Sequence, residues 1–346
     1  MTAIDPAAIE RHDQAGMLAD IVAQPLQLED ALWRSESAGL PSTEAPGGLL
    51  VCGMGGSAIG ADLAAAVLGD RATRPLHVLR GYSPPGWLTS EYFVLCSSYS
   101  GDTEETLACY EAARISDAPR AVLTTGGRLA AMAREDEVPV IGIPSGMQPR
   151  AAVIYMVVGA MAAAAACNAA PSLRGEVEQA ELLLRGLADE WGPGAKGSLA
   201  AEVAHRLHGT VPVVHGSGPT LAPAMRWKTQ VNENAETAAF YSPLPEANHN
   251  EICGWERGHG LAPLSAVFLE SVDQHPRVRR RVELTAQLAR DAGADCTLVD
   301  AKGDTPFERV LSLVLLGDLV SFYLAVLEGI DPTPVDPIER FKAELG

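Results

Sequence analysis

The sequence predicts an α/β protein with two parallel sheets, each flanked by helices in a three-layer α/β/α arrangement. Short apolar runs bounded by glycine alternate with helical runs along the chain, which is typical of parallel sheets covered on both faces. The alternation breaks once, at residues 167–175, and a second series of the same kind follows. A length of 346 residues also favours two domains over one.

The first series follows a helical stretch at residues 5–38 that Pro25 interrupts. Its expected strands are the apolar runs GLLVCG, PLHVLRG, YFVLCSS, RAVLTTG and VPVIGIPSG. A helix is expected at 57–69, where a glycine ends it. The expected organisation is therefore a helical segment at 1–45, a first domain at 46–170 and a second domain at 171–346.

The second series contains expected helices at 176–191, 198–208, 220–234, 276–292 and 306–328. Its expected strands are VPVVHGSG, SAVFLES and CTLVDA. The order of strand, glycine turn and helix in VVHGSGPTLA repeats that of LLVCGMGGSAIG, which suggests internal duplication. The most apolar segment, 151–167, is shorter than the roughly 20 residues that a bilayer requires, so a core or subunit-interface helix is expected.

The formal net charge is −18, which argues against a wide basic surface for nucleic acid or an anionic membrane. This negative charge is compatible with an anionic small ligand, because a few local hydrogen-bond donors can bind the ligand despite the overall negative potential. The chain does not open with a basic region followed by an apolar stretch. We therefore expect a cytoplasmic enzyme with a small-molecule substrate and with no nucleic-acid or membrane partner.

The segment GMGGSA (53–58) has the glycine pattern of a dinucleotide-binding turn after a strand. Such a site also requires an acidic residue at the end of the second strand, where this chain has Arg80. NAD is therefore disfavoured, and an oxidoreductase using NADP is a minor alternative. The amides that open the next helix still suit an anion, since glycines let it approach and the helix dipole favours it.

A second turn, CSSYSGDTEETL (96–107), crowds hydroxyls between a strand and a helix and contains no Lys or Arg. In a parallel sheet both turns lie at the carboxyl ends of strands, where such folds bind ligands. The hydroxyls expected to surround one phosphate are those of Ser57, Ser98, Ser100 and Thr103. Helix capping is the alternative, but it explains one or two of these hydroxyls and not four.

Residues 227–256 hold carboxylates, an imidazole and amides at a density that is unusual between core elements. A zinc site of His249, Glu251 and His259 is one interpretation, although the spacing matches no standard signature. A solvated polar loop is another. The third is proton transfer, with a glutamate as base and a histidine as acid, which requires no cofactor.

Four motifs together resemble the bifunctional phosphoglucose/phosphomannose isomerases of the sugar isomerase (SIS) superfamily. They are GMGGSAIG (53–60), SYSGDTEET (98–106), NENAE…EANHNEICGWE (232–256) and GIDPTPVDPIERFK (329–342). The resemblance implies two SIS domains and a homodimer with shared active sites. It also implies reversible isomerisation of glucose 6-phosphate or mannose 6-phosphate with fructose 6-phosphate, through a cis-enediol and without a metal or other cofactor.

The resemblance also implies roles for individual residues. It assigns the 6-phosphate to Gly55, Gly56, Ser57, Ser98, Ser100 and Thr103. Glu233 is implied to move the proton between C2 and C1, and His249 of the neighbouring subunit to open the sugar ring. Arg150 is implied to steady the enediolate, and Thr333 to leave room for both C2 epimers. As the base, Glu236 and Glu246 are alternatives to Glu233.

Two positions depart from the family pattern. Asp102 replaces a common Asn, and its carboxylate repels a bound dianion unless it faces outward. Glu236 stands where the family often has Lys. A non-catalytic SIS-type sensor of sugar phosphates is therefore the alternative function, although the basic helix-turn-helix of such sensors is not found here. Arg340 shares a helix face with Thr333 if the last helix starts that early.

Overall fold

The computed structural model describes residues 4–345, which form two compact units. The first unit comprises Ala23–Leu183 and Thr305–Glu308. The second comprises residues 4–22, 184–304 and 309–345. Each unit contains one sheet in which all neighbouring strands are parallel, so the predicted α/β fold with two parallel sheets is confirmed.

The first sheet has the strand order β2-β1-β3-β4-β5. Its strands are β1 (Gly48–Cys52), β2 (Leu76–Leu79), β3 (Tyr92–Ser97), β4 (Arg120–Thr124) and β5 (Val140–Gly142). The helices of this unit are α3 (Gln24–Ser37), α4 (Gly55–Leu68), α5 (Glu104–Ile115), α6 (Gly127–Glu135) and α7 (Val153–Ala166), with short 3-10 helices η1 (Gly69–Arg71) and η2 (Pro149–Ala152).

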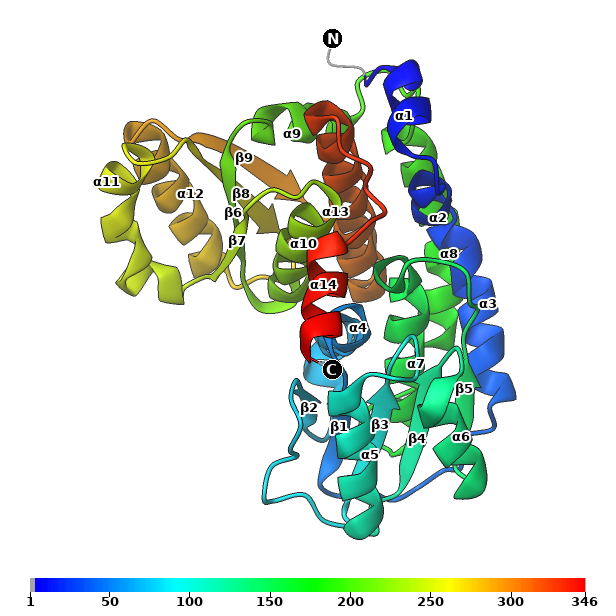
Figure 1. Cartoon of the computed structure of the whole chain (residues 1–346). Coiled ribbons are helices and arrows are strands. Elements are labelled where there is room, and N and C mark those ends of the chain that lie inside the picture. Colours follow the sequence, from blue (N-terminus) through cyan, green and yellow to red (C-terminus); the bar gives the residue numbers. More distant parts are fainter. Residues whose placement is uncertain (1–3, 346) are drawn as a thin grey trace. The chain divides into compact units, whose positions relative to one another are not determined.

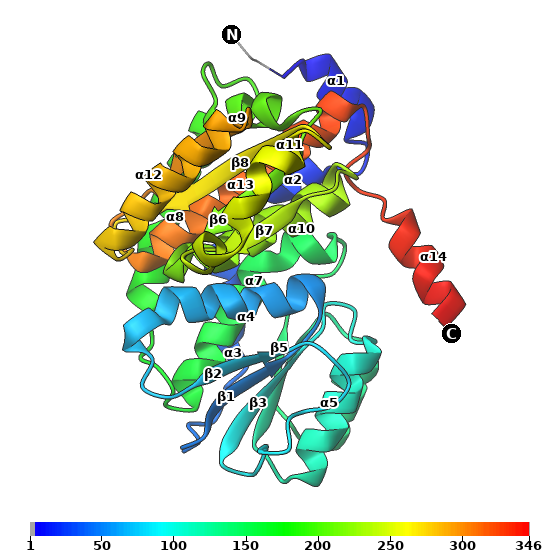
Figure 2. The same ribbon diagram turned by 90° about the vertical axis from the view of Figure 1, so that its left-hand side faces the viewer.

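Helices cover both faces of this sheet (Figure 1). α5 and α6 close one face over an apolar cluster that includes Leu50, Val94 and Tyr110. α4 and α7 pack together on the other face, and α3 packs on α7 (Figure 2). Every residue of β1 is buried, as expected for a strand with helices on both sides.

The second sheet has the strand order β7-β6-β8-β9. Its strands are β6 (Val211–Gly216), β7 (Phe240–Pro243), β8 (Leu264–Glu270) and β9 (Asp295–Asp300). The remaining helices are α1 (Pro6–His12), α2 (Met17–Val22), α8 (Arg174–Trp191), α9 (Leu199–Leu207), α10 (Leu221–Asn234), α11 (Trp255–His259), α12 (Pro276–Asp291), α13 (Pro306–Glu328) and α14 (Asp336–Leu345), with η3 (Gly218–Thr220), η4 (Glu246–His249) and η5 (Glu251–Gly254).

In the second unit α12 packs on β8 and β9 over an apolar cluster that includes Trp255, Phe268 and Val282. α10 packs against β6 and β7. The edge strand β7 was not among the strands expected from the sequence, because it is short and two of its four side chains are exposed.

The limits of the two units differ from the expected domain limits. α1 and α2 group with the second unit, whereas α3 groups with the first, where it packs on α7. The change from one unit to the other after Leu183 falls inside α8 rather than at the interruption of the pattern. A helix packs on whichever core covers its apolar face, and the sequence does not say which core that is.

Among residues 4–345, two helical segments, Pro149–Ala166 and Pro306–Glu328, are long and apolar enough to cross a membrane. In the apolar 18-residue stretch of each, 78% and 94% of the positions, respectively, are buried within the protein, as in core helices of a folded domain. The first of them contains the segment expected to be a core or interface helix.

His215, near the end of β6, is a buried histidine in the second unit. Its side chain is 1% exposed and stacks on Phe268, with ring centroids 4.6 Å apart. Within residues 4–345, neither ring nitrogen has a hydrogen-bond partner. Burial disfavours the charged imidazolium and lowers the pKa of His215 to about 4.

This histidine predicts acid sensitivity. The unfolded chain takes up the His215 proton near its ordinary pKa of about 6.5, and the folded chain resists it down to about 4. The stability contributed by the neutral ring is therefore present above pH 6.5 and is lost as the pH falls toward 4, by about 3 kcal/mol at most. The urea midpoint should fall between pH 7.5 and pH 5, and the fall should be smaller in His215→Phe than in the wild type. An identical pH dependence in both proteins would contradict the assignment.

Candidate active site

Two polar turns of the first unit lie where the strand order of its sheet reverses. The chain runs from β1 out to β2 on one side, then returns to β3 on the other side of β1. Gly53 and Met54 follow β1, and residues 98–103 follow β3, so both turns lie at the carboxyl ends of adjacent parallel strands. Ligands of open α/β sheets bind at such a switch point.

The two turns are in contact, because Ser57 Oγ accepts a hydrogen bond of 3.2 Å from the Tyr99 backbone N–H. Within the second turn, the hydroxyls of Ser98 and Thr103 share a hydrogen bond of 2.8 Å. Ser100 Oγ accepts from the Asp102 backbone N–H at 3.2 Å. The sequence-predicted hydroxyls of one phosphate site are therefore gathered on two neighbouring turns.

Helix capping does not explain the hydroxyl of Thr103. This residue is the N-cap of α5, but its side chain makes no capping hydrogen bond. Its hydroxyl instead pairs with Ser98, which is 1% exposed and also accepts from the Gly101 backbone N–H at 3.1 Å. The hydrogen bonds therefore arrange these hydroxyls next to one another rather than along the helix end.

The glycine turn leaves the Gly55 and Gly56 amides for an anion, while the Ser57 and Ala58 N–H groups donate to the Met54 carbonyl at 3.0 and 3.3 Å. The N-cap residue Met54 makes no side-chain capping bond, and the first turn of α4 carries no acidic residue. Gly55 has a φ of +49°, a left-handed conformation, with open space where a Cβ atom would stand. Amides that open a helix without a cap are the donors that a phosphate uses.

Arg150 belongs to the same unit and lies beside the glycine turn. A Cβ atom on Gly56 would stand 3.1 Å from the Pro149 carbonyl oxygen and 3.3 Å from Arg150 Cα, so only glycine fits this approach without a shift. Arg150 is 4% exposed, and its Nη1 donates to Gln148 Oε1 at 3.3 Å. A buried, fixed guanidinium is suited to stabilising negative charge.

The carboxylate of Asp102 binds the start of α6. Asp102 Oδ1 accepts a hydrogen bond of 2.9 Å from the Arg128 backbone N–H, in the first turn of that helix. A Cβ atom on Gly127 would stand 2.8 Å from Asp102 Oδ2, which shows how closely the two turns pack. The dipole of α6 favours a negative charge at this place. The departure from the family's Asn therefore serves as a helix cap.

In the second unit, burial distinguishes the three candidate bases. Glu233 is partly buried on the last turn of α10, whereas Glu236 and Glu246 are exposed. Glu236 follows the helix in a left-handed conformation with a φ of +48°. Glu246 Oε1 accepts from Asn250 Nδ2 at 2.9 Å. A base that removes a weakly acidic carbon-bound proton benefits from desolvation, so the geometry favours Glu233.

The helix that carries Glu233 is fixed to α13 at several points. Arg226 and Asp318 form a buried ion pair through two hydrogen bonds of 2.9 and 2.8 Å, with both side chains 1% exposed. Trp227 Nε1 donates to the Leu313 carbonyl at 2.7 Å. Near Glu233 itself, Asn234 Nδ2 donates to the Ser321 hydroxyl at 2.9 Å. These contacts give the last turn of α10 a rigid support.

His249 is exposed at the end of η4, and the residue before it is tied down. Asn248 Nδ2 donates to Thr285 Oγ1 of α12 at 2.7 Å, and its Oδ1 accepts from Arg281 Nη1 at 3.2 Å. Glu251 accepts a short hydrogen bond of 2.5 Å from Ser242 Oγ of β7. The imidazole is thus presented outward by an anchored segment.

The zinc interpretation of this segment has no geometric support. Glu251 is bound to Ser242, and His259 Nδ1 accepts from the Leu264 backbone N–H at 3.3 Å. Across the described part of the chain, no group of three or more His, Cys, Asp or Glu residues is placed to hold a metal ion.

Thr333 lies between α13 and α14 and is half-buried. Its backbone N–H donates to Asp331 Oδ1 at 2.9 Å. Because α14 begins at Asp336, Thr333 precedes the helix, so the condition for a helix face shared with Arg340 is not met.

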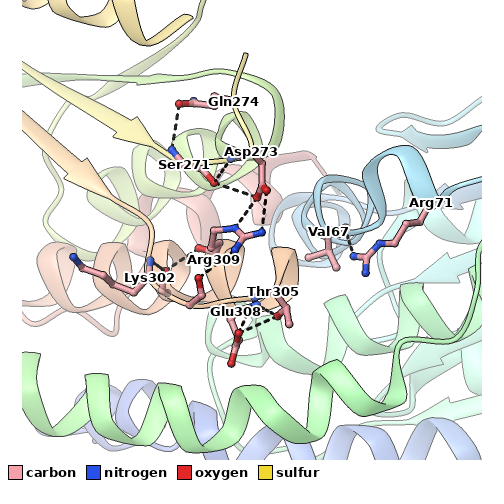
Figure 3. Close-up of polar contacts among 11 residues, drawn as sticks. Val67, Arg71, Ser271, Asp273, Gln274, Lys302, Thr305, Glu308 and Arg309 are labelled. Atoms are coloured by element: carbon pink, nitrogen blue, oxygen red, sulfur yellow. Dashed lines mark hydrogen bonds and ion pairs between the residues drawn. The ribbon is translucent and has the colours of Figure 1, made fainter. Parts of the chain in front are cut away.

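The equivalent switch point of the second sheet is occupied by its own side chains. Gln274 Nε2 donates to Thr220 Oγ1 at 2.9 Å and to the Ser217 carbonyl at 3.2 Å, which fills the turn after β6. Asp273, on the loop after β8, binds both Arg309 Nε and Nη2, at 2.6 and 2.9 Å (Figure 3). The repeated strand–glycine–helix pattern is real in the fold, but here its polar groups satisfy one another.

The parallel α/β units and the match to a family model define the class of SIS-domain proteins. Residues 196–345 match the family model described as "Bacterial phospho-glucose isomerase C-terminal SIS domain". A hypothetical protein from Thermus thermophilus has a similar fold, with a TM-score of 0.77, 16% identity and coverage of 98% of this chain and 92% of the other. A putative phosphosugar isomerase from Clostridium difficile gives a TM-score of 0.72, with 10% identity and coverage of 95% and 98%.

The sequence relatives are more specific. A bifunctional phosphoglucose/phosphomannose isomerase from Caldicellulosiruptor bescii is 35% identical over 86% of this chain and 89% of its own length. One from Aquifex aeolicus is 34% identical over 86% and 90%, respectively. The chain belongs to the bifunctional phosphoglucose/phosphomannose isomerase family. A relative with another activity, a D-glucosamine-6-phosphate 4-epimerase from Sulfolobus acidocaldarius, is 34% identical over 47% of this chain and 51% of its own length.

Two features of the first unit's site cannot be read from the sequence. They are the orientation of Asp102, which depends on the start of α6, and the contacts of Tyr99. The only local signal for Tyr99 is its position between Ser98 and Ser100.

Proposed function

We propose that this protein is an aldose–ketose isomerase that interconverts glucose 6-phosphate and mannose 6-phosphate with fructose 6-phosphate. The observation that carries the proposal is the set of paired hydroxyls and uncapped α4 amides beside the buried Arg150, in a chain of this family. Amides and hydroxyls hold the phosphate dianion without a lysine. The phosphate-binding residues are Gly55, Gly56, Ser57, Ser98, Ser100 and Thr103.

The chemistry requires three further groups. His249 donates a proton to the ring oxygen and opens the sugar, a step suited to an imidazole near neutral pH. Glu233 removes the proton from C2 and returns it to C1, so one carboxylate serves two adjacent carbons. Arg150 stabilises the cis-enediolate that forms between these steps. The proposed reaction uses no metal and no other cofactor.

Assembly and epimer tolerance belong to the same proposal. His249 acts on the substrate of the neighbouring subunit in a homodimer, for which its exposed position on an anchored segment is suited. Thr333 lies near C1 and C2 and leaves room for both epimers. We place the enzyme in the cytoplasm, at the hexose 6-phosphate step of glycolysis.

Coupled assays test the proposal. Purified protein treated with a chelator is given glucose 6-phosphate or mannose 6-phosphate, and fructose 6-phosphate is detected. Formation of the ketose from both aldoses is the expected result. Binding of these sugar phosphates without turnover would instead identify a sensor, and a 4-epimer as product would identify the chemistry named for the shorter match.

The capping role of Asp102 gives a separate prediction. Asp102→Asn keeps an acceptor for the Arg128 N–H, so the KM for fructose 6-phosphate should change by less than about twofold. A carboxylate in contact with the phosphate would instead give about a fivefold fall in KM when its charge is removed, since that repulsion is worth about 1 kcal/mol. Asp102→Ala removes the cap and should cost about 1 kcal/mol of stability, measured by urea unfolding.

A further inference from the structure

Tyr99 stands between two of the phosphate hydroxyls, and its backbone fastens the phosphate turn to two other elements. Its N–H donates to Ser57 Oγ at 3.2 Å, at the start of α4. Its carbonyl oxygen accepts from the Thr125 backbone N–H at 3.0 Å and from Thr125 Oγ1 at 2.8 Å, between β4 and α6. The backbone of this residue therefore sets the shape of the turn.

The side chain of Tyr99 reaches a different segment. Its hydroxyl oxygen accepts a hydrogen bond of 3.1 Å from the Met147 backbone N–H. Met147 lies on the irregular chain between β5 and η2, three residues before Arg150. The contact joins residues 48 positions apart in the sequence, so it is a tertiary link and not part of a local turn.

The segment at 143–152 leads directly to the guanidinium. Gln148, the residue after Met147, accepts from Arg150 Nη1 at 3.3 Å, and its carbonyl accepts from the Ala151 N–H at 2.8 Å. The segment also meets the glycine turn, where Gly56 approaches Arg150 Cα. Both phosphate-binding turns therefore contact the chain that carries Arg150, one through glycine packing and the other through the Tyr99 hydroxyl.

We propose that Tyr99 is a positioning residue that couples occupation of the phosphate turn to the placement of Arg150. Its backbone is hydrogen-bonded within the phosphate site, and its hydroxyl binds the Met147 N–H. A change in the turn is therefore passed to the segment that carries Arg150. Removing the hydroxyl leaves the backbone contacts of the turn in place but releases the Met147 N–H. A displacement of about 1 Å at a group that stabilises the transition state costs up to about 100-fold in rate, with a smaller effect on binding.

The first test is independent of catalysis. Inorganic phosphate is added to the full-length wild type and to Tyr99→Phe, and amide hydrogen exchange is measured in residues 97–106 and 143–152. Phosphate should slow exchange in both segments of the wild type. In Tyr99→Phe it should still protect 97–106 but no longer protect 143–152. Equal protection of both segments in both proteins would overturn the coupling.

The second test is kinetic and rests on the proposed function. Tyr99→Phe should lower kcat about tenfold or more while KM changes by less than about threefold. The matched control is Tyr110→Phe, which removes a buried hydroxyl that donates to Asp136 Oδ2 at 2.8 Å on the α5–α6 side of the same unit. It should leave kcat unchanged. In an Arg150→Met background, Tyr99→Phe should have no further effect on kcat.

The outcomes separate the two proposals. A wild type that does not isomerise sugar phosphates overturns the proposed function, while the exchange experiment still decides the coupling. An active wild type whose kcat is insensitive to Tyr99→Phe, or whose Tyr99 and Arg150 effects are additive, overturns the positioning role.

Discussion

Glu233→Gln is expected to lower kcat for isomerisation by about 10²–10⁴-fold, the contribution typical of a general base. The amide is nearly the same size as the carboxylate but cannot accept the C2 proton. Because α10 is held to α13 through Arg226, Trp227 and Asn234, the substitution should leave the fold and the affinity for fructose 6-phosphate nearly unchanged. Turnover by coupled assay and binding by calorimetry measure the two quantities separately.

The matched control is Glu236→Gln. Glu236 lies three residues later, outside the helix, and is exposed. It should keep wild-type kcat, because its carboxylate is solvated and poorly suited to a desolvated proton transfer. If Glu236→Gln were inactive and Glu233→Gln retained full activity, Glu236 and not Glu233 would be the base.

Asp318→Ala is expected to lower the free energy of unfolding by about 3–5 kcal/mol, because it removes the carboxylate paired with the buried guanidinium of Arg226. Both side chains are 1% exposed, so water does not readily replace the lost partner. Urea unfolding of the purified protein measures the loss, and the loosening of α10 should lower activity as well.

Asp291→Ala is the control for this second prediction. Asp291 is an exposed residue of α12 that accepts from Gln287 Nε2 at 2.7 Å on the helix surface. Its removal should cost less than about 0.5 kcal/mol. Arg226→Met combined with Asp318→Leu should restore much of the loss, since an apolar pair leaves no buried charge uncompensated. Equal costs for the two single aspartate variants would contradict the role of the pair.

The parallel sheets could be predicted because their strands carry a strong local signal. Runs such as GLLVC and YFVLCS are apolar on both faces, and each is followed by a turn and a helix. β7 carries no such signal, because it is a short edge strand with Phe240 and Tyr241 exposed. Its pairing with β6 arises from tertiary structure rather than from local composition.

The composition of the phosphate turns was predictable, whereas their supports were not. Four hydroxyls and a glycine turn are visible in the sequence, and their meeting follows from the topology of a parallel sheet. The cap that Asp102 provides for α6 depends on a contact 26 residues away. The link from Tyr99 to Met147 spans 48 residues. The sequence around each residue does not indicate its distant partner, so these two contacts are visible only in the folded chain.

Solvent deuterium incorporation shows whether a side-chain base carries the proton between C1 and C2. Fructose 6-phosphate is incubated with the chelator-treated enzyme in D₂O, and the products are followed by proton NMR over many turnovers. Proton transfer by a side-chain base predicts glucose 6-phosphate and mannose 6-phosphate that carry deuterium at C2, with both signals lost in Glu233→Gln. Unchanged fructose 6-phosphate, or aldoses whose C2 receives only protium, would contradict proton transfer by a side-chain base.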